Sequence, residues 1–414
     1  MALAQKLIRL GLIIYAISST TTISGMGLGV FLAFIGLVIM FIRVKMNTPS
    51  AVAATPFEKR GINILPEDRN IIYCVIFFLC VVTLSTFFSY KFDSSIKRLV
   101  GLSSEVLLLF AVLSVEESSD GKFFKTVLNI ILIAVAFESI YGILQYFTGL
   151  NVLGSKGITK YGRIMGTLGY YNSLGAMTGI ILPVIFSKII YVAEKRFLFC
   201  IIFILVCTAL VFTFTRGAWI GALVAIGIIS VIRNKKLLLI PLAIIVLLFL
   251  IPQTRTRIIE QTFRPTDGDI QRVFIWESSI TLLKERPFLG WGLDTYKEIV
   301  EGRYKKGLGH FHSHNIYIGL FQETGIFGLL SFLLIVYFTV RRIIHNYKNN
   351  QDLWVRMMNI GFLGSLVVFL IHGFVDYTIR AESGYFFWFI IGMVMLRGEH
   401  ILSRVYDVNP APRH

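Results

Sequence analysis

Apolar runs long enough to cross a lipid bilayer recur from one end of this chain to the other. A helix needs about 20 mostly apolar residues to cross the hydrocarbon core, and 55% of the 414 residues are hydrophobic, more than one soluble core can bury. Backbone groups in lipid must bond within their own segment, so the runs are predicted to be helices. The chain is therefore predicted to be an all-α polytopic membrane protein. About twelve spans are expected: 7–23, 26–42, 70–88, 98–115, 125–147, 172–192, 197–214, 217–232, 236–251, 315–339, 354–373 and 383–397.

Lysine and arginine in the short loops predict the orientation. Pairs and triplets such as Arg233/Lys235/Lys236 fit cytoplasmic loops when both termini are cytoplasmic. The first run is expected to be a retained helix, because no obvious small-residue cleavage site follows it. Four parts are expected: membrane domain 1–251 with spans one to nine, an outer loop region 252–314, membrane domain 315–397 with spans ten to twelve, and a cytoplasmic tail 398–414.

The formal charge of +16 is large for a membrane protein. No basic soluble domain exists to carry nucleic acid, so that partner is excluded. The segment 252–314 holds many of the Lys and Arg residues and lies outside on this topology, which suggests a polyanionic partner. A solvated surface or contact with the phosphates of membrane lipids is the alternative for part of this charge. The four cysteines all fall in apolar runs, which argues against a disulfide framework or a Cys-based zinc site.

Two arginines are candidates for binding an anion. Arg216 lies in a short turn between two predicted spans, and the small residues Gly217 and Ala218 would leave room for a ligand beside it. Arg272 lies near the start of a predicted amphipathic helix over 270–284, and helix N-termini favour anions. The alternatives are an interfacial anchor for Arg216 and an incidental surface position for Arg272.

A third candidate is His314, at the end of the sequence His310-Phe311-His312-Ser313-His314, where a polar loop meets an apolar helix. Histidine exchanges a proton near neutral pH. Alternating histidines could bind zinc, but no Cys or carboxylate stands at a convincing ligand spacing, so no metal is predicted. A structural role is the other alternative. Proton transfer, or a hydrogen bond to a substrate hydroxyl, is favoured.

Weaker candidates for substrate binding are Arg163, Asn172, His312, Asn315 and Asp376. Asn172 is expected to cap the following span. His372 and Asp376 are i,i+4 neighbours, for which a structural hydrogen bond is favoured over catalysis. No Walker-type loop or dinucleotide fingerprint is present, so no cofactor is predicted.

These residues together resemble the O-antigen ligase and polymerase superfamily of bacterial cell-envelope glycosyltransferases. The ligase pattern His-(Asn/Ser/Gln)-x9-Gly-x-x-(Gly/Thr/Tyr) is complete at His314, Asn315, Gly325 and Gly328. The turn Thr215-Arg216-Gly217 looks like the (Ser/Thr)-Arg-Gly turn of that superfamily.

Two further segments carry the resemblance. The first has the form Arg-x3-Trp followed by Pro-x2-Gly-x-Gly, at Arg272, Trp276, Pro287, Gly290 and Gly292. The second is similar to Arg-x2-Gly-Thr-x4-Asn, from Arg163 to Asn172, with Tyr170 and Tyr171 where a proline often occurs. The resemblance covers residues 163 to about 395 and follows the order and sidedness of the superfamily's motifs.

The resemblance implies a GT-C-like, metal-independent, inverting enzyme of the bacterial inner membrane with a periplasmic active site. It would transfer a glycan from undecaprenyl diphosphate to a sugar hydroxyl, which in a ligase belongs to lipid A-core. By carry-over, Arg216 and Arg272 would bind the diphosphate and His314 would act on the acceptor hydroxyl.

Two alternatives remain. A polymerase would use the same chemistry with another carrier-linked repeat unit as the acceptor. A transporter of anionic lipids would place charged residues in the middle of the spans, where almost none is found apart from Glu105 and Glu138, and this counts against it.

Overall fold

The computed structural model describes residues 2–46, 66–115, 121–149, 162–263, 267–303 and 312–396. Every regular element in these ranges is a helix, which confirms the predicted all-α class. The elements are α1 (Ala2–Ser18), α2 (Ile23–Met46), α3 (Pro66–Phe87), α4 (Phe92–Leu113), α5 (Lys122–Thr148), α6 (Tyr171–Tyr191), α7 (Arg196–Phe212), α8 (Arg216–Arg233), η2 (Lys235–Leu238), α9 (Leu239–Leu250), α10 (Pro252–Phe263), α11 (Asp267–Glu285), α12 (Tyr296–Arg303), α13 (Ile316–Asn349), α14 (Leu353–His372) and α15 (Ala381–Met395).

Each of the twelve predicted spans falls on one of these helices, but a count of twelve crossings is not confirmed. Seven helices of the described ranges are long and apolar enough to cross a membrane: α2, α3, α5, α6, α8, α13 and α14. The helices α7 and α15 are apolar but shorter. With 12 residues, α9 is about 18 Å long at 1.5 Å per residue, well short of the roughly 30 Å of a hydrocarbon core. The first predicted span also ends early, because α1 stops at Ser18.

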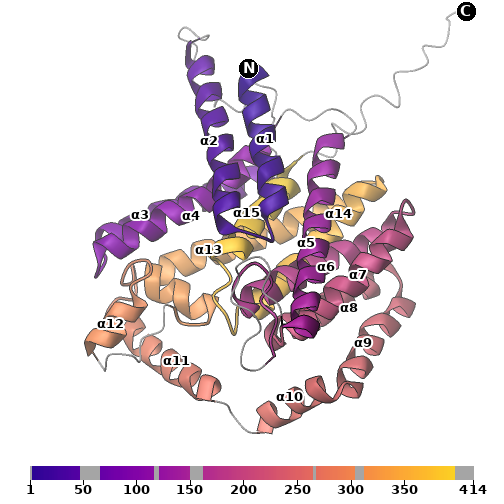
Figure 1. The fold of residues 1–414 in the computed structure, drawn as a ribbon. Coiled ribbons are helices and arrows are strands. Elements are labelled where there is room, and N and C mark those ends of the chain that lie inside the picture. The colour runs from indigo at the N-terminus through magenta and orange to yellow at the C-terminus, as the bar shows by residue number, and fades with distance from the viewer. Residues whose placement is uncertain are drawn as a thin grey trace, which may run out of the picture.

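The centre of the molecule is formed by α6, α8, α13, α14 and α15 (Figure 1). The helices α6 and α8 both pack against α14. Small residues allow the backbones to approach closely: Gly179 of α6 faces Ala218 of α8 and Val368 of α14, and Gly364 of α14 faces Pro183. Close packing of small residues stabilises helix contacts where no hydrophobic effect operates, as in lipid. This packing fixes the ends of α8 and α14, where several of the predicted site residues lie.

The long helix α13 is broken at Gly325, which has φ 68° and ψ −170°. The loop before α12 enters this break. The backbone N–H of Trp291 donates to the Gln322 carbonyl at 2.9 Å, and that of Gly292 donates to the Glu323 carbonyl at 3.0 Å. A Cβ on Gly325 would collide with the Phe288 carbonyl. The predicted continuous helix 315–339 is thus interrupted where it receives the glycine-containing loop.

The segment from α9 to α12 runs along the lower rim of the view in Figure 1. The predicted helix over 270–284 is confirmed as part of α11, which packs against α13, but its predicted amphipathic character is wrong, because Val273 and Ile280 of the expected apolar stripe are exposed. A small hydrophobic cluster joins α11 to α12 and includes Ile275, Leu282, Trp291 and Tyr296. This cluster joins α11 to α12, and the contact of α11 with α13 places both beside the membrane helices.

The two acidic residues expected inside spans are both engaged by neighbouring groups. Glu105 pairs with Arg98 at 2.8 Å. Glu138 accepts hydrogen bonds from the backbone N–H and the hydroxyl of Thr167, at 2.5 and 2.9 Å. These contacts give both carboxylates a structural role in fixing segments of the chain.

Candidate functional site

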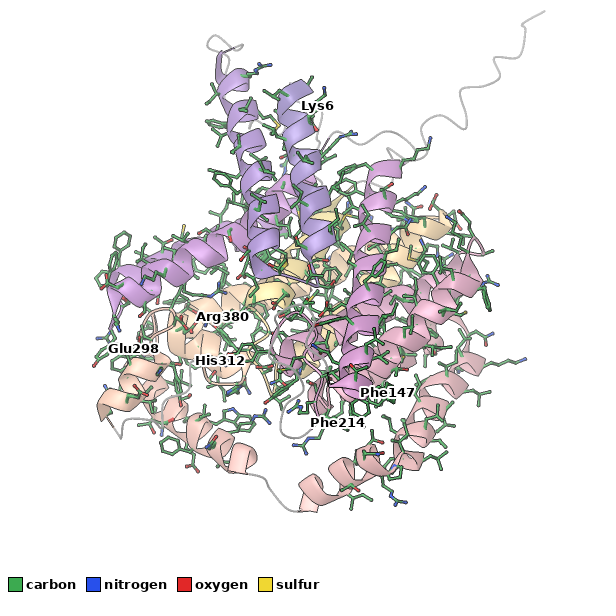
Figure 2. The ribbon with its side chains drawn as sticks, viewed as in Figure 1. Lys6, Phe147, Phe214, Glu298, His312 and Arg380 are labelled. Atoms are coloured by element: carbon green, nitrogen blue, oxygen red, sulfur yellow. The ribbon has the colours of Figure 1, made fainter. Side chains whose placement is uncertain are left out.

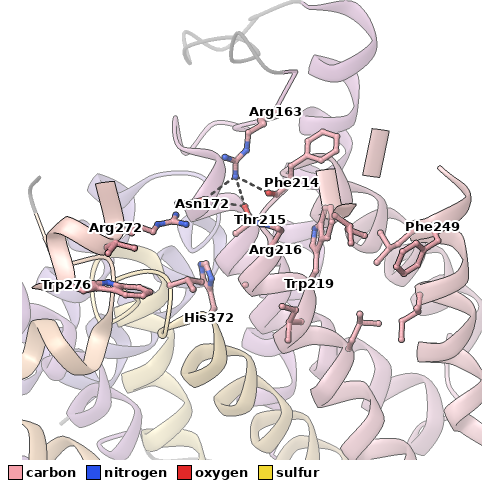
Figure 3. Close-up of a pocket in the computed structure, with 18 residues that line it drawn as sticks. Arg163, Asn172, Phe214, Thr215, Arg216, Trp219, Phe249, Arg272, Trp276 and His372 are labelled. Carbon is pink, nitrogen blue, oxygen red and sulfur yellow. Dashed lines mark hydrogen bonds between the residues drawn. The ribbon is translucent and has the colours of Figure 1, made fainter. Parts of the chain in front are cut away.

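A cavity of about 610 Å³ contains both of the arginines singled out from the sequence, Arg216 and Arg272. One part of its lining is polar and includes Arg163, Asn172 and His372. Another part is apolar and is supplied mainly by α8, α9 and α10, through Ile220, Leu223, Ile245, Leu248, Phe249 and Ile258. Figure 3 shows Arg272 and His372 pointing toward the turn that carries Arg216, with Phe249 on the far side of Trp219. The cavity thus has a cationic part and an apolar part.

Arg216 is the first residue of α8, directly after the tight turn from α7. Phe214 in this turn has φ 51°, in the left-handed region. Gly217 was expected to leave room for a ligand beside the guanidinium. In the structure, a Cβ on Gly217 would collide with Val375 and would lie 2.8 Å from Nδ1 of His372, so the glycine admits the loop after α14.

Arg163 holds this turn from outside. Its Nε donates to the Thr213 carbonyl at 2.8 Å, and one terminal nitrogen lies 3.3 Å from both the Phe214 carbonyl and the Asn172 side-chain oxygen. Its guanidinium also stacks on the Tyr171 ring, 3.3 Å from the ring centroid. Through these contacts the guanidinium of Arg163 orders the backbone turn before Arg216. Arg163 also lines the cavity (Figure 3).

The predicted capping role of Asn172 is wrong. The helix α6 begins at Tyr171, the N-cap position is Tyr170, and no side chain caps it. The Asn172 side chain instead accepts a hydrogen bond from Arg163. Asn172 therefore contributes to the turn at Arg216 rather than to the start of its own helix.

His314 lies immediately before α13, with φ 49°. The next residue, Asn315, caps the helix by accepting hydrogen bonds from the backbone of Tyr317 at 2.9 Å and Ile318 at 3.0 Å. The Asn315 amide also donates to the Phe374 carbonyl at 3.1 Å. A residue with positive φ is strained and persists only where its surroundings hold it. The cap and the link to the loop after α14 supply that restraint for His314.

The carboxylate of Asp376 lies close to the imidazoles of His314 and His372. Oδ1 of Asp376 is 3.6 Å from Nδ1 of His314, and Oδ2 is 3.5 Å from Nε2 of His372. Burial alone raises the pKa of the Asp376 carboxyl, but the contacts with His314 and His372 outweigh it and hold that pKa well below its usual range. Asp376 therefore carries a negative charge that faces both rings.

His312 is the other imidazole of this cluster. Its Nδ1 accepts a hydrogen bond from the His314 backbone at 3.3 Å, and the two ring centroids are 4.4 Å apart. Burial and the neighbouring His314 lower the pKa of His312 to about 4, so this ring is neutral near pH 7. His310, at the other end of the motif, lies outside the described residues.

His312, His314 and Asp376 are also the residues that could hold a metal ion, since their candidate ligand atoms lie within 4.8 Å of one another. A catalytic zinc site uses three such protein ligands about 2 Å from the ion. Here Asp376 also faces His372, and His312 already accepts a hydrogen bond through Nδ1. A histidine oriented by a carboxylate explains the same arrangement without an ion. A chelator would inhibit an enzyme with a metal centre here but not one with a carboxylate-oriented histidine.

Sequence reasoning missed a polar network beneath the loop after α14. The Tyr377 hydroxyl donates to Glu323 at 2.5 Å, and Arg380 forms two hydrogen bonds to Asp294, at 2.7 and 3.1 Å. Figure 2 shows Arg380 and His312 in the same part of the molecule. The network ties this loop to α13 and to the segment before α12, and so fixes Asp376. In the sequence, only the position of Glu323, within the motif before Gly325, could have indicated this network.

Comparison with known proteins indicates the family that part of this chain resembles. Residues 201–333 match a family model described as O-antigen ligase, which confirms the predicted superfamily resemblance over that segment. The matched segment contains Arg216, Arg272 and His314. The chain is also 27% identical over 161 residues to an uncharacterized protein of Haemophilus influenzae, a match that covers 33% of this chain and 40% of the relative. The chain thus spans well under half the length of that relative.

Proposed function

We propose that this protein is an O-antigen ligase, which transfers a glycan from undecaprenyl diphosphate to a sugar hydroxyl of lipid A-core. The observation that carries the proposal is the combination of Arg216 and Arg272 on one cavity that also has an apolar wall. A polyprenyl diphosphate needs both the arginines and the apolar wall, because its diphosphate is anionic and its polyprenyl tail is apolar. The family match to O-antigen ligase supports the same reaction class.

The donor's diphosphate would lie between Arg216 and Arg272. Guanidinium groups bind phosphate oxygens through paired, charge-assisted hydrogen bonds. Such groups also stabilise the charge that develops as the glycosyl–oxygen bond breaks, and catalysis depends on stabilising charge that grows in the transition state. The first isoprene units would lie along Ile220, Leu223 and Phe249.

His314 would act as the general base. With its Nδ1 toward Asp376, the neutral ring carries its proton on Nδ1 and offers Nε2 as the acceptor. The acceptor hydroxyl gives its proton to Nε2 as its oxygen bonds to C1 of the donor sugar. The bond from C1 to the phosphate oxygen breaks, and the diphosphate leaves with the electron pair. Attack from the side opposite the leaving group inverts the anomeric centre.

The enzyme would lie in the bacterial inner membrane with both termini in the cytoplasm, and the cavity would face the periplasm. The Lys and Arg distribution of the short loops supports this orientation. The bundle would be GT-C-like and the reaction independent of metal.

A gel of envelope glycans from a deletion strain tests the function. A ligase predicts that polymer attached to lipid A-core disappears while long carrier-linked chains accumulate. A strain left with single repeat units on the acceptor would instead identify a polymerase, which the family match does not distinguish from a ligase. Unchanged glycans of both kinds would refute glycan transfer. Complementation with the native gene provides the control.

A further inference from the structure

His372 has no role in the function proposed so far, although it lines the same cavity as Arg216 and Arg272. It is the last residue of α14 and is 1% exposed. Its ring points toward the turn that carries Arg216 in Figure 3. Sequence reasoning favoured a structural hydrogen bond to Asp376 for this residue.

Both ring nitrogens are buried and make no hydrogen bond within the described part of the chain, but their surroundings differ. Nε2 faces Oδ2 of Asp376 at 3.5 Å, an ion-pair distance, whereas no acceptor faces Nδ1. Within the described part of the chain, Nδ1 is buried and has no hydrogen-bond partner. A buried polar atom without a partner is costly, so such an atom beside a cavity indicates a missing ligand.

The surroundings of Nδ1 favour an anion. Nδ1 lies against the first turn of α8 at Gly217, where a Cβ would come within 2.8 Å of it. The N-terminus of a helix favours negative charge, and Arg216 is the first residue of α8. On its other side the ring faces the Asp376 carboxylate. An imidazole with an anion on each side is stabilised with a proton on both nitrogens.

We propose that His372 is a third donor-binding residue, whose Nδ1–H donates a hydrogen bond to the diphosphate while Asp376 holds Nε2–H. The inference rests on the proposed function, and it deepens it in one respect. Asp376 then supports the donor-side imidazole of His372 and the acceptor-side imidazole of His314 with its two oxygens. Diphosphate binding and hydroxyl activation therefore depend on the same carboxylate.

The test compares two substitutions that each keep one nitrogen of the ring. In His372→Asn the amide nitrogen lies near the place of Nδ1, and in His372→Gln it lies near that of Nε2. Purified full-length protein in detergent is titrated with undecaprenyl diphosphate, and with undecaprenol as the lipid that lacks phosphate. Tryptophan fluorescence reports binding, since Trp219 and Trp276 line the cavity. His345→Gln, at an exposed position on α13, is the matched control.

We expect His372→Gln to weaken undecaprenyl diphosphate binding about tenfold or more, the loss typical of one hydrogen bond to a charged group. The affinity of His372→Asn should stay within about threefold of the native affinity, a change in binding free energy of about 0.7 kcal/mol. The control should bind as the native protein does. Binding of undecaprenol should not respond to either substitution.

The outcomes separate a wrong role for His372 from a wrong proposed function. Native affinity in a folded His372→Gln, alongside weakened binding in Arg216→Ala, overturns the role of His372 and leaves the proposed function standing. A native protein that binds the diphosphate no better than undecaprenol overturns both. If His372→Gln does not fold, His372→Asn decides alone: a loss beyond about tenfold in this folded variant refutes the assignment to Nδ1.

Discussion

The backbone N–H of Ile326 donates a hydrogen bond to the carbonyl of Pro287 at 2.8 Å, which joins the break in α13 to the loop that precedes α12. Two segments with similar glycine-containing patterns, far apart in the sequence, thus form one structural unit. This unit anchors the residues between α11 and α12 against the helix that begins just after His314. Gly290 and Gly325 therefore allow the two segments to approach each other closely at this junction.

Gly325→Ala should destabilise the protein strongly. A Cβ there meets the Phe288 carbonyl, and the φ of 68° is unfavourable for alanine. The two effects together should cost about 1–3 kcal/mol or more, seen as a lower midpoint of thermal unfolding in detergent. Gly227→Ala in α8 is the matched control, because nothing lies within 4 Å of its Cβ position. An equal midpoint for Gly325→Ala and the native protein would contradict this account of the break.

Arg163→Ala should lower both stability and donor affinity. Arg163 binds the Thr213 and Phe214 carbonyls, so its loss frees the turn that presents Arg216. Lysine cannot reproduce a planar group that contacts several acceptors, so Arg163→Lys should not restore either property. Thermal unfolding and titration with undecaprenyl diphosphate measure the two effects. A variant with native stability and reduced affinity would instead assign Arg163 to direct ligand binding.

Substitution of His314 by alanine should reduce glycan transfer by about 10²–10⁴, the usual contribution of a positioned general base. Asp376→Asn should also reduce transfer, because the amide cannot stabilise a protonated imidazole. Transfer is measured in proteoliposomes with lipid-linked donor and purified acceptor. His345→Gln serves as the histidine control. Near-native rates in a folded His314→Ala variant would exclude His314 from proton transfer.

The contribution of His312 to stability should be lost as the pH decreases from about 6.5 to about 4. The pKa of His312 is about 4 in the folded protein and near 6.5 in an unfolded chain, so in this range the unfolded state binds a proton that the folded state does not. The lowered pKa of Asp376 has a separate effect: its stabilisation is present above the unfolded pKa of about 3.9 and is lost as the pH falls below that value.

His312→Gln isolates the first of these effects. The stability of the variant relative to the native protein should rise as the pH falls from 6.5 to 4, while the two should respond alike below that range. The midpoint of thermal unfolding, followed across the pH series in one detergent, measures the difference. Parallel curves for both proteins would show that His312 is not held neutral by its surroundings.

Removal of divalent metal should leave transfer unchanged. The proposal assigns the neutralisation of the diphosphate to Arg216 and Arg272, both on the cavity, and needs no ion at His312, His314 and Asp376. Transfer assayed with EDTA or 1,10-phenanthroline should match transfer without them. Loss of activity that added zinc restores would assign these three residues to a metal centre instead.

Several structural features followed directly from local sequence. The helices could be predicted because apolar runs must fold as helices in lipid. The helix at Arg272 was also predicted, but not its buried face, which includes Ile275 and Leu282. The sequence also singled out Arg216, Arg272 and His314, because unusual residue types at the ends of apolar helices stand out. Their roles remain predictions, but the structure places the first two on one cavity and links the third to its edge through Asp376.

Other features could not be predicted from the same information. Helix length was misjudged at α1 and α9, since hydropathy does not reveal where a chain turns. Asn172 was read as a cap because only its local neighbours were visible, whereas its partner Arg163 reaches it from nine residues away along the chain. The buried network of Glu323, Tyr377, Asp294 and Arg380 joins segments separated by tens of residues.

The sequence by itself determined that this chain forms apolar helices with a few cationic and titratable residues at their ends, because hydropathy and residue type act locally. Only the tertiary structure decided which of these residues meet. The packing of α14 against α6 and α8 brings His372 beside Gly217, and the cap at Asn315 joins His314 to the loop that carries Asp376. Such contacts depend on how helices cross, and crossing is set by side-chain packing between segments that are distant in sequence.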